Sequence, residues 1–249
     1  MTSFLLLHGG GMGGWVWRYI AGPLRAAGNE VHTPTFTGLG ERVHLIGRDI
    51  TCATHVADVM GVIEHEELTD VVLVAHSYAG SVAPGIVAAA AGRIARVIYI
   101  DAIVPHGGES VVEAMGYMTG AQARETAAML SRGEGPVGAG VPAQVRAMAD
   151  AEPQRMSPER DAWVFRHLTD MPLSCNVNPV VAGADSIDVQ VTYLAVPLTM
   201  MQPMHERAAA LGWTVQQLGG DRDHMVHVGD PESVLPYLQA ATTDSGLER

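Results

Sequence analysis

Short apolar runs alternate with amphipathic stretches along most of this 249-residue chain. Strands of a parallel sheet form near-continuous apolar runs, because helices cover both faces of such a sheet. Runs of this kind predict strands at residues 4–7, 30–35, 71–74, 96–100, 191–196 and 214–218. Helical patterns predict helices at residues 15–27, 54–68, 81–91, 205–211 and 231–239. The alternation indicates right-handed βαβ crossovers, and therefore an α/β fold with a mostly parallel, twisted sheet flanked by helices.

The alternation stops between residues 105 and 188, a stretch of roughly 80 residues that is too long for a loop in a compact domain. We expect a core of residues 1–104 and 189–249, with residues 105–188 inserted as a helical cap over the carboxyl edge of the sheet. Helical patches within this insertion lie at residues 122–130, 143–149 and 158–168. Its large apolar side chains predict either a roof over a site or simple packing onto the core: Met115, Met118, Met129, Met148, Met156, Trp163 and Phe165.

The strand at residues 71–74 continues directly into Ala75-His76-Ser77-Tyr78-Ala79-Gly80. A strand, a sharp turn and a helix of small residues would lift the Ser77 hydroxyl above the end of the sheet, as in a nucleophile elbow. The tight turn requires small residues two positions before and two after the serine. Glycine is usual there, whereas this chain has Ala75 and Ala79. A serine in such a turn is more often structural. Whether Ser77 is a nucleophile therefore depends on whether the rest of the chain supplies an oxyanion hole, a histidine and an acid.

Three consecutive glycines, Gly9, Gly10 and Gly11, follow the first predicted strand. Without side chains, such a loop can point backbone N–H groups into a site, as an oxyanion hole requires. A plain turn or a phosphate loop is the alternative. Gly9, Gly11 and Gly14 match the spacing of a dinucleotide-binding loop, but no convincing acidic partner follows, so we expect no cofactor. His8 is expected to brace this loop.

A candidate general base, His224, lies between the last predicted strand and the last predicted helix. This position places it on a loop at the same sheet edge as Ser77. His227 is a nearby competitor, but its position next to the helix favours a structural role. His76, next to Ser77, is expected to pack or form a hydrogen bond locally.

The acid that should orient His224 is found by elimination. Residues 197–203, which follow the strand at 191–196, contain no carboxylate. Asp101 directly follows the strand at 96–100 and is the remaining choice. Asp221 and Asp223 are excluded because they lie too close to His224 in sequence. Asp185 and Asp188 are excluded because they precede a strand.

Composition restricts the partners and the compartment. The hydrophobic content of 47% allows a sizeable core, and the net charge of −12 argues against a nucleic acid or an anionic membrane as partner. Cys52 and Cys175 are too few and too far apart for a disulfide framework or a zinc site, so we expect a reducing cytoplasm and no metal. Residues 1–7 lack a basic region and predict a strand rather than a signal peptide. No apolar run approaches the ~18 residues of a membrane span.

These stretches together resemble the α/β-hydrolase superfamily over nearly the whole chain. The resemblance is carried by residues 7–15, 75–80 and 223–225, and residues 34–42 are similar to a bacterial branch of the group. Within the superfamily the chain looks like small esterases related to plant methylesterases and hydroxynitrile lyases. The resemblance implies the α/β-hydrolase fold with its inserted cap.

The resemblance also implies roles for individual residues. Ser77 would be the nucleophile, His224 the base, and the backbone N–H groups of Gly10 and Tyr78 the oxyanion donors. Neighbouring residues are candidates for substrate contacts: Gly9, Gly11, Met12 and Met225.

The chain departs from the family pattern at the acid, because Thr199 stands where the family usually has a carboxylate. Residues 99–103, with Asp101 at their centre, resemble the context in which certain haloalkane dehalogenases carry their acid. Hydroxynitrile lyases use a threonine and a lysine where this chain has Gly9 and Met225, so that activity is excluded. Dehalogenases and epoxide hydrolases need an aspartate nucleophile, which Ser77 replaces.

We predict a serine hydrolase that cleaves a small-to-medium carboxylic ester or lactone through an acyl-enzyme on Ser77. One alternative is a tailoring enzyme that uses the same pocket for cyclisation, C–C cleavage or acyl transfer. Another is a catalytically silent protein that binds a ligand in that pocket. The sequence leaves open whether the chain forms a homodimer.

Overall fold

The computed structural model describes residues 1–151, 156–197 and 199–242, and for residues 148–151 it describes the backbone alone. Its sheet has six strands in the order β2-β1-β3-β4-β5-β6, and every neighbouring pair is parallel. The strands are β1 (Ser3–Leu7), β2 (Glu30–His32), β3 (Val71–His76), β4 (Ile94–Ile100), β5 (Gln190–Ala195) and β6 (Thr214–Gln217). This is the predicted parallel sheet, and each predicted strand is present.

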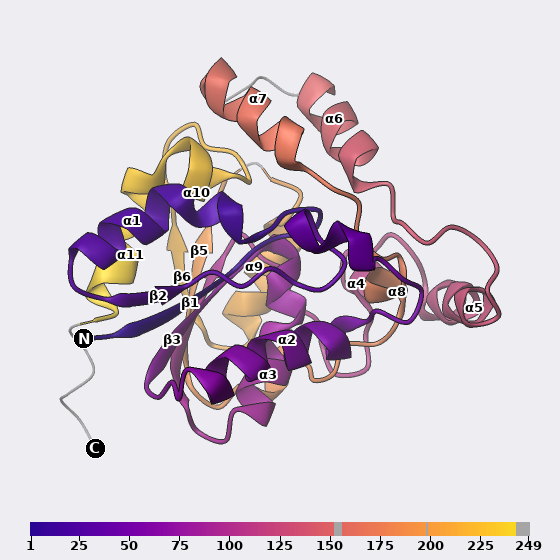
Figure 1. Ribbon diagram of the computed structural model, residues 1–249, viewed down its shortest axis with the longest axis horizontal. Coiled ribbons are helices and arrows are strands. Elements are labelled where there is room, and N and C mark those ends of the chain that lie inside the picture. The colour runs from indigo at the N-terminus through magenta and orange to yellow at the C-terminus, as the bar shows by residue number, and fades with distance from the viewer. Residues whose placement is uncertain (152–155, 198, 243–249) are drawn as a thin grey trace.

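Two helical layers cover the sheet, which explains why its central strands are largely apolar (Figure 1). Leu5 and Leu7 of β1 pack into one hydrophobic cluster, and Phe4 and Leu6 pack into the cluster on the opposite face. The first face is covered by α2 (Cys52–His65), α3 (Ala83–Ala89) and α9 (Gln202–Ala210). The second face is covered by α1 (Arg18–Ala26), α10 (Val226–Gly229) and α11 (Leu235–Ala240).

The ends of several elements differ from the sequence prediction. The helix predicted to start at Thr54 begins at Cys52, because Thr51 and Thr54 form a reciprocal capping box. The first predicted helix is divided into the 3₁₀ turn η1 (Gly14–Trp17) and α1. The helix predicted after the elbow is likewise divided, into η3 (Ser77–Ser81) and α3.

Between β4 and β5 the chain forms a helical insertion that shares the hydrophobic core of the sheet. Its helices are α4 (Val111–Ala114), α5 (Gly120–Ser131), α6 (Val141–Ala151), α7 (Pro158–His167) and α8 (Ser174–Val177). Val111, Val141, Met171 and Cys175 belong to the same cluster as the core helices α2 and α3. Helix α7 lies above α1 and α10 with α6 beside it, whereas α5 projects to the side (Figure 1). The short helices α4 and α8 were absent from the sequence prediction.

No helix among the described residues is both long enough and apolar enough to cross a membrane.

Candidate active site

A sharp turn at the end of β3 places Ser77 at the carboxyl edge of the sheet. Ser77 has φ of 54°, a left-handed conformation that a serine rarely adopts. Ala75 and Ala79 on either side are fully buried, so only small side chains fit. The loop after β4 holds the turn from outside, because the Ile103 N–H donates to the Ser77 carbonyl oxygen at 3.0 Å. Alanine therefore serves here where glycine is usual.

A hydrogen bond joins the candidate base to the candidate acid across 123 positions of sequence. The Nδ1 of His224 lies 2.8 Å from Oδ2 of Asp101. Asp101 follows β4 with φ of 42° and is fully buried, whereas the His224 side chain is 25% exposed. An ionised carboxylate only accepts hydrogen bonds, so Nδ1 carries the proton and Nε2 of His224 is left as an acceptor.

Three further donors surround the other oxygen of Asp101. His205 Nε2 lies 2.9 Å from Oδ1, the Thr199 hydroxyl donates at 3.2 Å, and the Val196 N–H donates at 3.4 Å. Burial opposes ionisation of Asp101 and is the largest influence, but the hydrogen bonds from His205 and His224 outweigh it, so its pKa lies below the ordinary value. Asp101 is thus held as a carboxylate.

His76 links the elbow to the loop that carries His224. Its Nε2–H donates to the His224 carbonyl oxygen at 2.9 Å, and the two rings lie 4.7 Å apart. His76 is fully buried and packs beside the elbow, as one half of the prediction has it, but its hydrogen-bond partner is 148 residues away in sequence rather than local. Within the described chain, no hydrogen bond joins the Ser77 hydroxyl to the His224 ring. Such bonds in free enzymes are often long and shorten only when the substrate is bound.

The glycine loop after β1 lies directly beside the elbow. A Cβ on Gly9 would lie 3.0 Å from Ser77 Cβ, and one on Gly10 would lie 3.8 Å from Tyr78 Cβ and 2.8 Å from Met171 Sδ. His8 braces the loop as predicted: its Nε2 accepts from the Phe36 N–H, so Nδ1–H donates to the Gly9 carbonyl at 2.8 Å. Glycine at these positions lets the loop approach Ser77 closely.

The Tyr78 hydroxyl is hydrogen-bonded within a buried cluster that includes His55 and Cys52. His55 donates through Nε2 to the Thr37 carbonyl, so its Nδ1 accepts from the Tyr78 hydroxyl at 2.9 Å. Cys52 Sγ lies 3.3 Å from the same hydroxyl. Burial raises the pKa of Tyr78 well above its ordinary value, so the phenol is neutral. These contacts anchor the residue whose backbone N–H follows Ser77.

Of the residues predicted to contact the substrate, one borders Ser77 and the others pack against the insertion or the core. Gly9 and Gly10 border Ser77 and Tyr78, whereas a Cβ on Gly11 would collide with Val141 and Thr169 of the insertion. Met12 is 5% exposed and packs in the core cluster beneath α1. Met225 packs against that cluster while partly exposed.

The methionine and aromatic side chains of the insertion do not gather into one roof. Met115 packs against one core cluster, and Met156 and Trp163 pack against the other. Phe165 lies under the Arg146 guanidinium, and Met129 is 37% exposed. The Met148 side chain lies outside the described part of the structure.

The site includes residues that the sequence did not reveal. His205 lies in the middle of a helix, and Thr199 stands at the family's usual acid position without a carboxylate of its own. Met171 covers Gly10 from the insertion. Their roles depend on contacts between distant segments, so no local pattern marks them. Among the described residues, no cluster of histidine, cysteine and carboxylate side chains is arranged to hold a metal ion.

The fold and this edge of the sheet define an α/β hydrolase, and comparison of the sequence agrees. The chain belongs to the alpha/beta hydrolase family, whose model matches residues 4–236. A carbendazim hydrolyzing esterase from Nocardioides sp. (strain SG-4G) is 49% identical over 112 residues, which are 45% of this chain and 46% of that protein. The alignment thus spans about half the length of that relative.

Solved structures share the fold at low sequence identity. An extracellular alpha/beta-hydrolase from a Paenibacillus species superposes with a TM-score of 0.74 at 21% identity, over 98% of this chain and 100% of that one. A methylesterase from Arabidopsis gives 0.72 at 18% identity, over 98% and 99%. Polyneuridine aldehyde esterase gives 0.70 at 17% identity, over 97% and 99%.

Proposed function

We propose that this protein is a serine hydrolase that cleaves a small-to-medium carboxylic ester or lactone through an acyl-enzyme on Ser77. The observation that carries the proposal is the 2.8 Å hydrogen bond between His224 Nδ1 and Asp101 Oδ2, formed at the sheet edge where the strained Ser77 turn lies. A buried carboxylate, an imidazole and an elbow serine together are the groups that acyl transfer requires.

In the proposed first step, the Ser77 hydroxyl attacks the substrate carbonyl carbon while His224 Nε2 takes its proton. The buried Asp101 carboxylate stabilises the imidazolium that forms and keeps the ring in the Nδ1–H tautomer. His224 then protonates the departing alkoxide, which leaves the acyl group on Ser77. In the second step His224 removes a proton from water, which attacks the carbonyl carbon of the acyl-enzyme. His224 then returns this proton to the Ser77 oxygen as the bond between serine and acyl group breaks, which releases the acid and restores the free serine.

The backbone N–H groups of Gly10 and Tyr78 are the proposed oxyanion donors. Both residues border the elbow, and Met171 and the His55–Cys52 cluster hold them from behind. Fixed donors stabilise the negative oxygen of the tetrahedral intermediate without reorganising, and each is worth about 10²–10³ in rate.

The similarity to an enzyme named for carbendazim supports hydrolysis and suggests a substrate to try. Carbendazim carries a methyl carbamate, whose carbonyl can accept the same attack as that of an ester. The matched residues cover less than half of the chain, so a substrate series is needed. We therefore include carbendazim beside simple esters and lactones of increasing chain length.

Labelling with a fluorophosphonate probe tests the nucleophile directly. We expect one equivalent of probe on the wild-type protein, with Ser77 as the modified residue, and turnover of at least one member of the substrate series. Ser77→Ala should abolish both, whereas Ser131→Ala, on the exposed face of α5, should retain both. Labelling that persists in Ser77→Ala would contradict the proposal, and a wild-type protein without labelling would favour a silent binding protein.

A further inference from the structure

Asp101 is held between two histidines, and each ring takes one carboxylate oxygen. His224 Nδ1 lies 2.8 Å from Oδ2, and His205 Nε2 lies 2.9 Å from Oδ1. The Asp101 side chain is closed to solvent, with 0% relative exposure. Because a carboxylate only accepts, His205 must carry its proton on Nε2.

The second oxygen of Asp101 is surrounded by donors from the segment after β5 and from α9. Asp101 follows β4, whereas the segment after β5, which carries Thr199, supplies hydrogen-bond donors instead of a carboxylate. A buried charge is costly unless all its oxygens are satisfied. The bonds from Thr199 and Val196 to Oδ1 are longer, at 3.2 and 3.4 Å, than the 2.9 Å contact with His205. His205 therefore makes the shortest contact on that oxygen.

His205 is also held in place from its own side. It lies in α9, and the Tyr193 ring of β5 meets its ring edge-on at 5.3 Å. Only 9% of the residue is exposed, and the exposed part lines a surface hollow of about 400 Å³ that Glu206 also borders. Neither Ser77 nor the glycine loop lines that hollow.

We propose that His205 is a positioning residue, which donates Nε2–H to Oδ1 of Asp101 and so keeps the second oxygen aimed, as an ionised acceptor, at His224. The inference rests on the proposed function of Ser77 and His224. Helix α9 would thus influence the reaction through His205 and Asp101, without itself supplying a group that contacts the substrate.

Kinetics of a set of variants test the proposal. His205→Ala should lower kcat about 10- to 100-fold, the range expected for loss of a hydrogen bond to a charged group, with KM nearly unchanged. His205→Gln retains an N–H donor of similar reach and should restore most of kcat. Glu206→Ala, which alters the same hollow but not Asp101, serves as the matched control and should behave as wild type. Thermal melting of each variant reports the fold.

Three results would overturn the inference: an unchanged kcat in His205→Ala, an equal loss in His205→Ala and His205→Gln, or a loss in His205→Ala that Glu206→Ala reproduces. A purely structural role would lower the melting temperature without rescue of kcat by glutamine.

Nitrogen NMR of the histidine rings provides a readout that needs no turnover. Measured in the Ser77→Ala protein, it should show His205 as the Nε2–H tautomer and His224 as the Nδ1–H tautomer. An Nδ1–H tautomer at His205 would overturn the inference even if the wild-type enzyme is active. Absence of probe labelling in the wild-type protein, with the expected tautomers present, would instead contradict the proposed function alone.

Discussion

Ser77 and Asp101 each adopt a left-handed backbone conformation, with φ of 54° and 42°. For residues other than glycine this conformation costs roughly 1–2 kcal/mol, and it persists only where surrounding contacts determine it. Here the Ile103 N–H holds the Ser77 carbonyl, and the Asp101 N–H donates to the Leu194 carbonyl at 2.9 Å. Both strained residues lie at strand ends on the same sheet edge, which is where function is expected to concentrate strain.

Substitution of Asp101 distinguishes the acid after β4 from the usual position after β5. We expect Asp101→Asn to lower kcat by orders of magnitude, because an amide favours the wrong tautomer of His224 and cannot stabilise its cation. Thr199→Ala removes the 3.2 Å hydrogen bond to Oδ1 together with the hydroxyl's bonds to the Val196 carbonyl and the Met201 N–H. Because its bond to Asp101 is longer than that of either histidine, the substitution should cost less than tenfold. Steady-state kinetics with one ester checks both variants, and a larger loss in Thr199→Ala would contradict the assignment.

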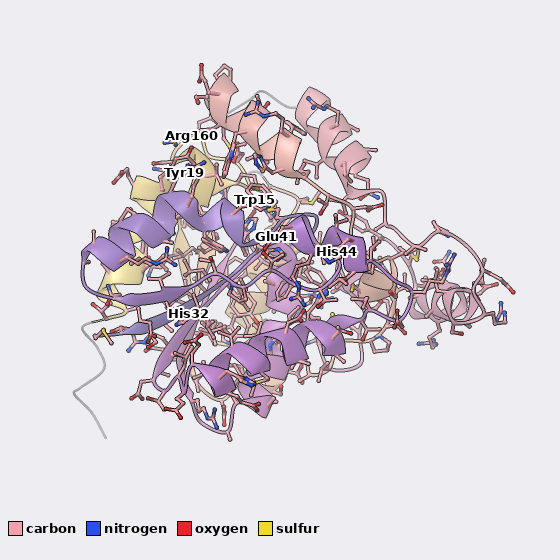
Figure 2. All side chains as sticks on the ribbon, viewed as in Figure 1. Trp15, Tyr19, His32, Glu41, His44 and Arg160 are labelled. Atoms are coloured by element: carbon pink, nitrogen blue, oxygen red, sulfur yellow. The ribbon has the colours of Figure 1, made fainter. Side chains whose placement is uncertain are left out.

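At the scale of elements, α7 joins the insertion to the core. Trp163 meets the Trp15 ring edge-on at 5.0 Å and lies beneath the Arg18 guanidinium at 5.2 Å. Arg160 lies over the Tyr19 ring and donates to the carbonyls of Val228 and Gly229 at 2.9 and 2.8 Å. Trp15, Tyr19 and Arg160 lie along this junction in Figure 2. Helix α7 thus contacts both α1 and α10, the helix that follows His224.

Truncation of Trp163 tests how much this junction contributes to stability. Trp163→Ala removes a half-buried aromatic side chain and should lower the free energy of unfolding by about 1–3 kcal/mol. For a chain of this size that corresponds to roughly 2–10 °C in melting temperature, measurable by calorimetry. Trp163→Phe retains an aromatic ring and should lose less than half as much. A wild-type melting temperature in Trp163→Ala would show that other contacts hold α7.

At the scale of the whole molecule, the core contains several neutral histidines. Burial lowers the pKa of His8 to about 3, of His55 to about 4, and of His227 to about 3. Burial also lowers the pKa of His76 well below its ordinary value, and the neighbouring His227 and His224 add to the effect. Both ring nitrogens of His227 lack a hydrogen-bond partner among the described residues. These buried histidines therefore stay neutral in the folded protein at pH values where they would be protonated in the unfolded chain.

Stability should consequently fall in mild acid. Each folded-state pKa lies below the unfolded value of 6.5, so the unfolded chain binds more protons between those values. The free energy of unfolding is retained above about pH 6.5 and falls by roughly 1.4 kcal/mol per pH unit for each histidine below it. Urea titrations at pH 7, 6 and 5 measure this slope.

His227→Phe is the informative variant for the acid slope, because the His227 ring packs at a tilt against Trp17 and His76 and has no hydrogen-bond partner among the described residues. Phenylalanine keeps the packing and removes one titrating group. The variant should match or exceed wild-type stability at pH 5, with a slope smaller by about 1.4 kcal/mol per pH unit. An unchanged slope would mean that His227 is protonated in the folded protein.

The sequence by itself determined the layers of this protein and the identity of its candidate nucleophile, base and acid. Apolar runs and helical patterns are local, and the carboxyl ends of parallel strands share one edge. Ser77, His224 and Asp101 could therefore be placed together from their positions after strands. Helix ends were less predictable, because a capping box such as that of Thr51 and Thr54 competes with other nearby caps.

Only the tertiary structure decided how the site is supported. The supporting residues come from three separate segments: His205 from α9, Thr199 from the loop after β5 and Met171 from the insertion. His205 contacts Asp101 across 104 positions of sequence and Thr199 contacts it across 98. The partner of His76 is a carbonyl 148 residues away. Such contacts depend on how packed layers bring distant segments together, and no periodicity along the chain encodes which side chain will face a buried carboxylate.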